Sequence, residues 1–182
     1  MRKLKIEELN RLSINEYKSI EKNNLIVILD NVRSQFNVGS IFRICDAFRI
    51  KKLTLCGITP IPPSREIEKT ALGSTLSVEW EYFKNTLDAI KFYKDQDYKI
   101  FIIEQTDESI FIHKFNYFFN NKICFVFGNE INGISDEILN HCDAAIEIPQ
   151  FGTKHSFNVS ISVAIVLYDF YYKNNLFNNQ LM

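Results

Sequence analysis

The chain has 182 residues, of which 46% are hydrophobic and 14% aromatic, so it is long enough for one buried core and too apolar to be disordered. Its formal net charge of -1 gives no overall sign of a polyanionic partner, although every arginine lies at or before Arg65, which permits one basic face. No apolar run reaches the roughly 20 residues that cross a bilayer, and the basic start MRKLKIEELNRLS lacks the apolar segment of a signal peptide. We therefore expect a cytoplasmic protein without a membrane segment.

The first half of the chain alternates between strand and helix patterns. Residues 1–23 are expected to form a helical lead-in, and NLIVILDNV (24–32) has the unbroken β-branched run of a buried strand. In NVGSIFRICDAFRI (37–50) apolar residues recur at helical spacing, and KKLTLCGI (51–58) predicts a second strand. A proline-rich turn then precedes a short helix over 64–74.

The second half continues this alternation with three strands and three helices. The expected strands are YKIFIIEQ (98–105), KICFVFG (122–128) and AAIEIP (144–149). The expected helices are 85–96, 135–142 and 158–173, and residues 174–182 form a tail. Alternating strands and helices predict an α/β fold: a single domain over 24–173 with a mainly parallel sheet flanked by helices.

The four cysteines, Cys45, Cys56, Cys124 and Cys142, are scattered through mostly apolar stretches and form no CxxC pair. This pattern predicts reduced thiols in the core and no metal site.

Polar clusters follow four of the expected strands. They are DNVRSQFNVGS, EQTD, GNEING and PQFGTKHSFN, and the carboxyl ends of parallel strands share one edge of a sheet, where ligands bind. Neither GxGxxG nor GxxxxGK[ST] occurs, so a standard NAD or ATP cradle is disfavoured. One residue of the last cluster, Ser156 or Asn158, is enough to cap the helix that follows. The cluster holds more polar residues than a cap needs, and this surplus points to a ligand.

Three segments, LDNVRSQFNVGSIFRICDAF, FVFGNEINGISDEI and IEIPQFGTKHSFNVSISVAIVLYDF, resemble the three motifs of the SpoU/TrmH family of RNA 2'-O-ribose methyltransferases, within the SPOUT superfamily. The resemblance covers roughly residues 24 to 173, with the motifs in the family's order after strands. It implies a C-terminal trefoil knot, S-adenosylmethionine as the cofactor, and a homodimer whose active sites are completed at the interface. Spacing alone would not predict a knot, because knots are rare.

The resemblance also implies which residues bind the cofactor. Backbone groups near Ile148 and Phe157 would hold the adenine, with help from Gly128, Asn129 and Thr106. The apolar helix that follows would pack on the sheet and on the partner subunit.

Five residues match the family's catalytic positions: Arg43, Asn37, Glu130, Ser156 and Asn158. Arg43 would act on the ribose 2'-hydroxyl, yet a guanidinium keeps its proton because its pKa exceeds about 12. Two alternatives stay open: Arg43 lowers the hydroxyl's pKa electrostatically, or contact with a substrate phosphate lets it act as the base.

The other four catalytic positions carry supporting roles in the resemblance. Asn37 either caps the helix that it opens or orders the catalytic loop, or does both. Glu130 would orient Arg43 or the substrate, and Ser156 and Asn158 would position the arginine and the ribose. His155 is left without a role.

Ile131 stands where many relatives have glycine, and residues 1–23 are too few for the RNA-binding domain that some relatives carry. The substrate RNA would then be held by the early arginines and lysines, with tRNA favoured over rRNA by analogy. The competing hypotheses are rRNA methylation, a catalytically silent RNA-binding protein on the same fold, and a flavodoxin- or Rossmann-type nucleotide enzyme, which the missing glycines disfavour.

Overall fold

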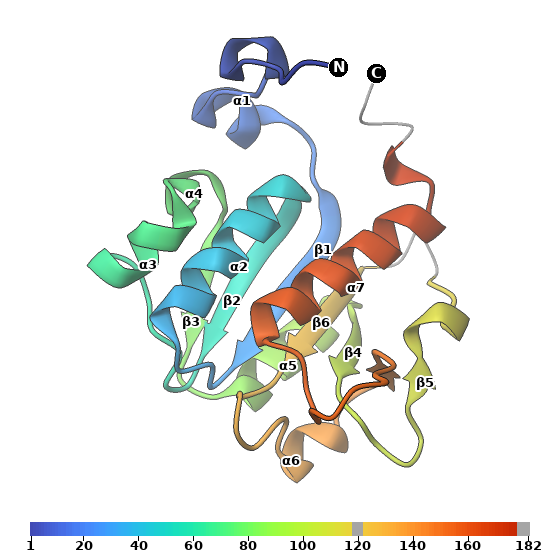
Figure 1. Ribbon diagram of the computed structural model, residues 1–182. Coiled ribbons are helices and arrows are strands. Elements are labelled where there is room, and N and C mark those ends of the chain that lie inside the picture. Colours follow the sequence, from blue (N-terminus) through green and yellow to red (C-terminus); the bar gives the residue numbers. More distant parts are fainter. Residues whose placement is uncertain (118–121, 178–182) are drawn as a thin grey trace.

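The computed structural model describes residues 1–117 and 122–177, which build an α/β fold around a seven-stranded sheet (Figure 1). The strands are β1 (Asn23–Asp30), β2 (Ile50–Cys56), β3 (Trp80–Phe83), β4 (Lys99–Ile103), β5 (Ile110–Phe111), β6 (Ile123–Phe127) and β7 (Ala144–Glu147). They lie in the order β3-β2-β1-β6-β4-β7-β5, and each neighbouring pair is parallel. The predicted α/β class and parallel sheet are confirmed.

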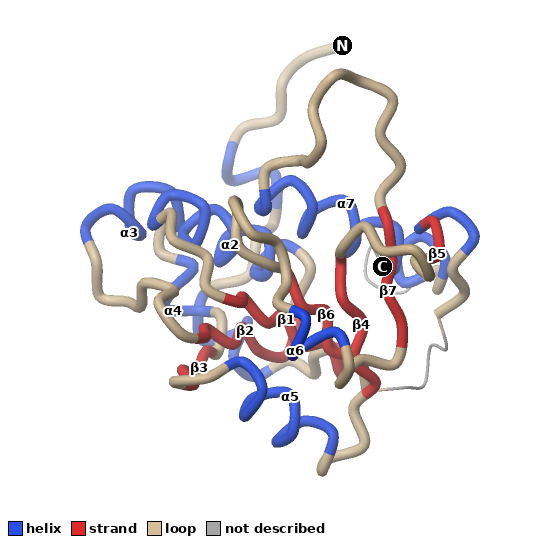
Figure 2. The backbone as a smooth tube through the Cα atoms, turned by 90° about the horizontal axis from the view of Figure 1, so that it is seen from below, coloured by secondary structure: helices blue, strands red, loops and turns tan. Residues whose placement is uncertain are grey.

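Helices cover both faces of this sheet. They are η1 (Ile6–Leu9), α1 (Ile14–Ser19), α2 (Gln35–Ala47), α3 (Arg65–Ala71), α4 (Ser74–Ser77), α5 (Thr86–Lys94), η2 (Ile112–Lys114), α6 (Asp136–Leu139) and α7 (Val159–Lys173). Figure 2 shows α2 and α7 on one face of the sheet and α5 on the other. The short helix α6 lies by the carboxyl ends of the strands and contacts α5.

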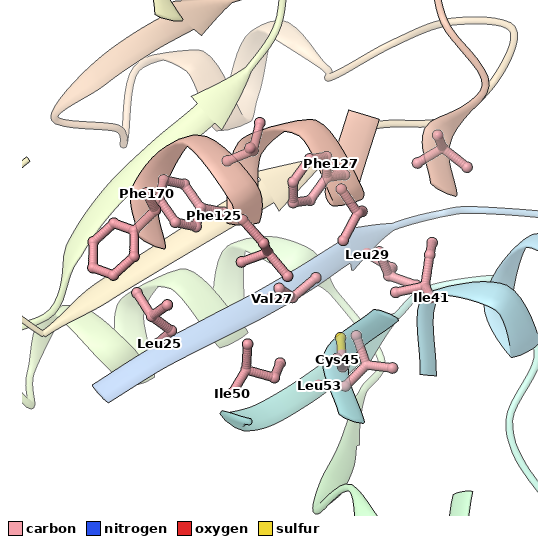
Figure 3. Close-up of a cluster of buried hydrophobic side chains, with 14 of the residues drawn as sticks. Leu25, Val27, Leu29, Ile41, Cys45, Ile50, Leu53, Phe125, Phe127 and Phe170 are labelled. Carbon is pink, nitrogen blue, oxygen red and sulfur yellow. The ribbon is translucent and has the colours of Figure 1, made fainter. Parts of the chain in front are cut away.

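The core explains why β1 has no polar alternation. Leu25, Val27 and Leu29 point into the cluster under α2 and α7 (Figure 3), whereas Ile26 and Ile28 join the cluster under α5. All five side chains are at most 1% exposed. A strand buried on both faces needs an apolar residue at every position, as parallel strands usually do.

Two strands and one break were not predicted from the sequence. The strands β3 and β5 lie at the two edges of the sheet and are four and two residues long. The helix expected over 64–74 divides into α3 and α4, because Leu72 and Gly73 adopt φ angles of 50° and 87°. A left-handed backbone cannot continue an α-helix, so the chain turns there.

The lead-in predicted for residues 1–23 contains η1 and α1, and Tyr17 on α1 is buried. In the predicted tail, Leu176 is buried, while residues 178–182 lie outside the described residues. The domain boundaries and the trefoil knot stay predictions.

Candidate functional site

The carboxyl ends of β4, β6 and β7 open onto one cavity of about 550 Å³, a volume within the range of small-molecule sites. In Figure 1 the ends of β4 and β6 lie on the lower side of the sheet, near α6. The five residues expected to bind the cofactor all line this cavity: Thr106, Gly128, Asn129, Ile148 and Phe157. The structure thus brings these residues together, and their individual roles stay predictions.

The cavity wall combines apolar side chains with main-chain polar groups. Ile103, Leu139 and Val159 contribute apolar surface, whereas the loops after the strands contribute polar side chains and peptide groups. A flat heterocycle with a polar rim matches such a lining, since its faces need apolar contact and its edge needs hydrogen bonds. The residues present therefore fit a nucleoside-type cofactor.

The loop between β6 and α6 is held in shape mainly by hydrogen bonds of Asn129. Asn129 accepts hydrogen bonds through Oδ1 from the amides of Ile131 and Asn132, at 2.8 and 3.2 Å, and donates through Nδ2 to the carbonyl of Asn31. A Cβ on Gly128 would lie 2.5 Å from the Gly133 carbonyl carbon, so the tight fold of this loop requires glycine there. Ile131 is 74% exposed at the rim of the cavity, so its side chain needs no space inside the folded loop.

The loop between β7 and α7 ends in a helix cap. Asn158 is the N-cap residue, and its Oδ1 accepts hydrogen bonds from the amide and the hydroxyl of Ser160, at 2.9 and 2.7 Å. Of the two expected caps, Ser156 or Asn158, the structure therefore uses Asn158. Ser156 lines the cavity instead.

Three of the predicted catalytic residues form one hydrogen-bonded group. The Asn37 amide donates through Nδ2 to the Glu130 carboxylate at 3.0 Å, and its Oδ1 accepts from Asn158 Nδ2 at 3.1 Å. Asn37 does not cap α2, contrary to one of the two expectations, because α2 begins two residues earlier and Ser34 is its N-cap. Its side chain is thereby free to join the loop after β6 to the loop after β7.

Glu130 is held at the beginning of α2 by main-chain donors as well. The amides of Arg33 and Ser34 donate to its carboxylate at 3.2 and 3.4 Å. Burial opposes ionisation of this carboxyl, but the hydrogen bonds from its own amide, Asn37, Arg33 and Ser34 outweigh burial and lower its pKa. Glu130 is therefore an anion at neutral pH, and it serves to fix the beginning of α2.

Arg43 lies apart from this hydrogen-bonded group. It is on the exposed side of α2, two turns after Phe36, and it has no hydrogen-bond or ion-pair partner among residues 1–117 and 122–177. The structure therefore gives no contact between Arg43 and Glu130, which was one of the expected arrangements. A guanidinium with no carboxylate beside it has its hydrogen-bond donors available to a substrate.

Sequence reasoning missed two cavity residues that carry structural contacts, Glu104 and Gln105. The polar run EQTD marked their loop, but nothing in it distinguished these two side chains from Thr106. Across the described part of the chain there is no cluster of three or more histidine, cysteine or acidic side chains suited to a metal. The described helices also include none that is both long and apolar enough to cross a membrane.

Known proteins are similar to this chain in sequence and in fold. The model of the SpoU rRNA Methylase family matches residues 24–168. A tRNA (guanosine(18)-2'-O)-methyltransferase of Borreliella burgdorferi is 29% identical over 169 residues, which cover 90% of this chain and 73% of that protein.

Solved structures with the same fold include two related enzymes. The TrmH/SpoU tRNA modifying enzyme of A. aeolicus superposes with a TM-score of 0.79 at 27% identity, covering 91% of this chain and 82% of that one. The AdoMet-bound rRNA methyltransferase of Sinorhizobium meliloti gives a TM-score of 0.77 at 26% identity, covering 86% and 59%. The resemblance inferred from the three motifs is thus confirmed, and the chain is an RNA methyltransferase that belongs to the SpoU rRNA methylase family.

Proposed function

We propose that this enzyme transfers a methyl group from S-adenosylmethionine to a ribose 2'-hydroxyl of tRNA. One observation carries the proposal: the cavity and the hydrogen-bonded group of Asn37, Glu130 and Asn158 share the same two loops. A cofactor site and a substrate-side group that share loops suit a direct transfer between two bound molecules. The similarity to tRNA-modifying relatives supports tRNA as the substrate.

The cofactor would occupy the cavity at the carboxyl edge of the sheet. Ile148 and Phe157 would enclose its adenine, and the loops at Thr106 and Gly128 would bound the rest. When bound, S-adenosylmethionine supplies an electrophilic methyl group on a sulfonium. The apolar wall at Ile103 and Val159 would keep water from that group.

On the substrate side, Arg43 has the chemistry that the reaction requires. A ribose oxygen gains negative charge as its hydroxyl loses the proton, and this makes it nucleophilic toward the methyl carbon. As the new O–C bond formed, the S–C bond of the cofactor would break and its electron pair would stay on sulfur as a neutral thioether. The exposed cation of Arg43 would stabilise the charge on the ribose oxygen, and a substrate phosphate or a water molecule would take the proton. Because a guanidinium rarely gives up its own proton, electrostatic stabilisation is the role that we propose.

We further propose that the enzyme is a cytoplasmic homodimer that pairs through α7. Ile161, Tyr168 and Tyr172 are 49%, 57% and 67% exposed, and their spacing places them along one side of that helix. An exposed apolar stripe on a helix usually contacts a partner. A second copy would supply surface on which RNA could bind beside Arg43.

The test of this proposal is transfer of labelled methyl from S-adenosylmethionine to total RNA of a strain lacking the gene, separated by size. We expect label in tRNA, at a site that resists cleavage because its 2'-hydroxyl is methylated. Label in ribosomal RNA would keep the chemistry and contradict the tRNA assignment. Cofactor binding by calorimetry without any label would favour the silent RNA-binding alternative.

Arg43→Ala tests the electrostatic role in the same assay. We expect turnover to fall at least about a hundredfold, as for loss of a charge-stabilising donor, with cofactor affinity within about twofold of the native value. Lys91→Ala, which removes a positive charge from α5 on the opposite face of the sheet, is the control and should retain turnover. Near-normal turnover of Arg43→Ala would rule out this role.

A further inference from the structure

Two glutamine side chains donate to one carbonyl oxygen in the loop between β7 and α7: Gln105 from the end of β4, and Gln150 from within the loop itself. Gln105 Nε2 donates to the carbonyl oxygen of His155 at 2.7 Å, and Gln150 Nε2 donates to the same oxygen at 3.2 Å. Gln105 follows the end of β4, which is a central strand of the sheet, so the loop is tied to a rigid element. A carbonyl oxygen has two lone pairs and can accept both bonds.

The residue before Gln105 holds the other loop. Glu104 accepts through Oε1 from the amide of Gln105 at 2.9 Å and through Oε2 from the amide of Ile134 at 3.1 Å. A Cβ on Gly133 would lie 2.3 Å from Oε2, and Gly133 has a φ of +63°, so only glycine permits this approach. The loop between β6 and α6 is therefore tied to the end of β4 as well.

These ties close a ring of hydrogen bonds around the cavity. Glu104 fixes the loop that carries Glu130, Gln105 fixes the loop that carries Asn158, and Asn37 joins Glu130 to Asn158 on the far side. Asn37 does not itself line the cavity. The cofactor side and the substrate side of the site are thus connected through side chains from four segments.

We infer that Glu104 and Gln105, the β4 clasp, are positioning residues that keep both loops closed over the cofactor cavity. The inference rests on the proposed function for the identity of the cofactor, but the clasp itself is a property of the protein alone. Opening the β7–α7 loop would remove Phe157 from the cavity wall and expose the cofactor to water. The clasp therefore sets cofactor affinity, and a bound cofactor in turn holds the loop in place.

The first test uses the protein without cofactor and measures tryptic cleavage after Lys154, which is exposed in this loop. Gln105→Ala should be cleaved about tenfold faster, because it removes the hydrogen bond that ties the loop to β4. Gln150→Ala removes a bond within the loop and should change the rate by at most about twofold. The double variant should be cleaved at about the rate of Gln105→Ala, because the tie to β4 is already lost in the single variant. Gln96→Ala, whose side chain donates to Phe92 on α5, is the matched control and should not change the rate.

The second test measures S-adenosylmethionine binding by calorimetry and turnover at saturating cofactor. Gln105→Ala should bind the cofactor about tenfold more weakly, while turnover at saturation stays within about twofold, and Gln150→Ala should bind it within about twofold of the native protein. Glu104→Gln retains one of the two accepted bonds and should weaken binding less than Glu104→Ala. A merely structural role would lower turnover and affinity together.

The inference is overturned if Gln105→Ala is cleaved at the native rate, or if Gln150→Ala speeds cleavage as much as Gln105→Ala does. It is also overturned if Gln105→Ala keeps native cofactor affinity although its loop is cleaved faster. Absence of cofactor binding by the native protein would contradict the proposed function, whereas the cleavage test would still decide whether the clasp exists.

Discussion

Asn37 illustrates how one side chain can specify a site. Its Nδ2 donates to a carboxylate and its Oδ1 accepts from another amide, and only a carboxamide supplies both a donor and an acceptor in this geometry. An aspartate at position 37 would face Glu130 with like charge and would lose the donor. The identity of this residue therefore follows from its two neighbours.

The lowered pKa of Glu130 makes the site sensitive to acid. The ionised carboxylate is favoured in the folded state, so its contribution to stability is full above the ordinary glutamate value of about 4.3 and is lost as the pH falls through the lowered value. Glu130→Gln should lower the melting temperature by about 1–3 °C at pH 7 and by less at pH 3. Melting curves from pH 3 to 7 check this; a difference that is constant with pH would contradict it.

The resemblance predicted Asn37, Glu130 and Asn158 as site residues, but their pairing was beyond the sequence. Asn37 is 93 residues from Glu130 and 121 from Asn158, so nothing local indicates that they meet. Glu104 and Gln105 escaped notice for the same reason. Their partners are backbone groups in remote loops, and backbone groups carry no residue signature.

At the scale of elements, the packing of α2 on α3 depends on one glycine. A Cβ on Gly39 would lie 2.2 Å from both the Ile67 carbonyl oxygen and Thr70 Oγ1. The carbonyl belongs to the backbone of α3 and cannot move aside without moving the helix. The close approach of these helices is what places Ser64, which donates to Gln35, beside the beginning of α2.

Gly39→Ala should therefore destabilise the fold. Alanine favours a helix over glycine by about 1 kcal/mol, but overpacking against backbone costs about 1–3 kcal/mol, and the clash is severe enough that the upper part of that range applies. Urea unfolding measures the net loss, which we expect at about 1–2 kcal/mol. Gly152→Ala is the control, because no atom lies near its added Cβ. If Gly39→Ala were as stable as the native protein, α2 and α3 would have to separate at little cost, which would contradict the prediction.

Most elements were predictable because burial dictates their patterns. β1 and β6 are buried on both faces of the sheet and therefore have unbroken apolar runs. α2 and α7 are buried on the side that faces the sheet and therefore have apolar residues at helical spacing. The edge strands β3 and β5 are short and partly exposed, so they carry no comparable pattern. Leu72 was unpredictable because its left-handed conformation is not one that leucine favours.

For the whole molecule, the α7 stripe predicts that two copies associate. Ile161→Asp would place a charge in the proposed interface. Burying an unpaired charge costs far more free energy than leaving it in water, so the variant should not dimerise. Sedimentation at micromolar concentration should show a native dimer and a monomeric variant, with Ile58→Asp, 59% exposed outside the stripe, as a dimeric control. A native monomer would contradict the composite active site.

The centre of the sheet also governs how the chain reaches this structure. β1 pairs with β6, so that Leu25 lies opposite Ile123, and the segments between them form other parts of the fold. The chain loses conformational entropy when it brings β1 and β6 together, before the contacts between them can form. This entropy loss slows folding. During synthesis, β1 leaves the ribosome long before β6 exists to cover its edge. Until then its apolar side chains have no complete core to enter, and nascent chains are most exposed to aggregation in that interval.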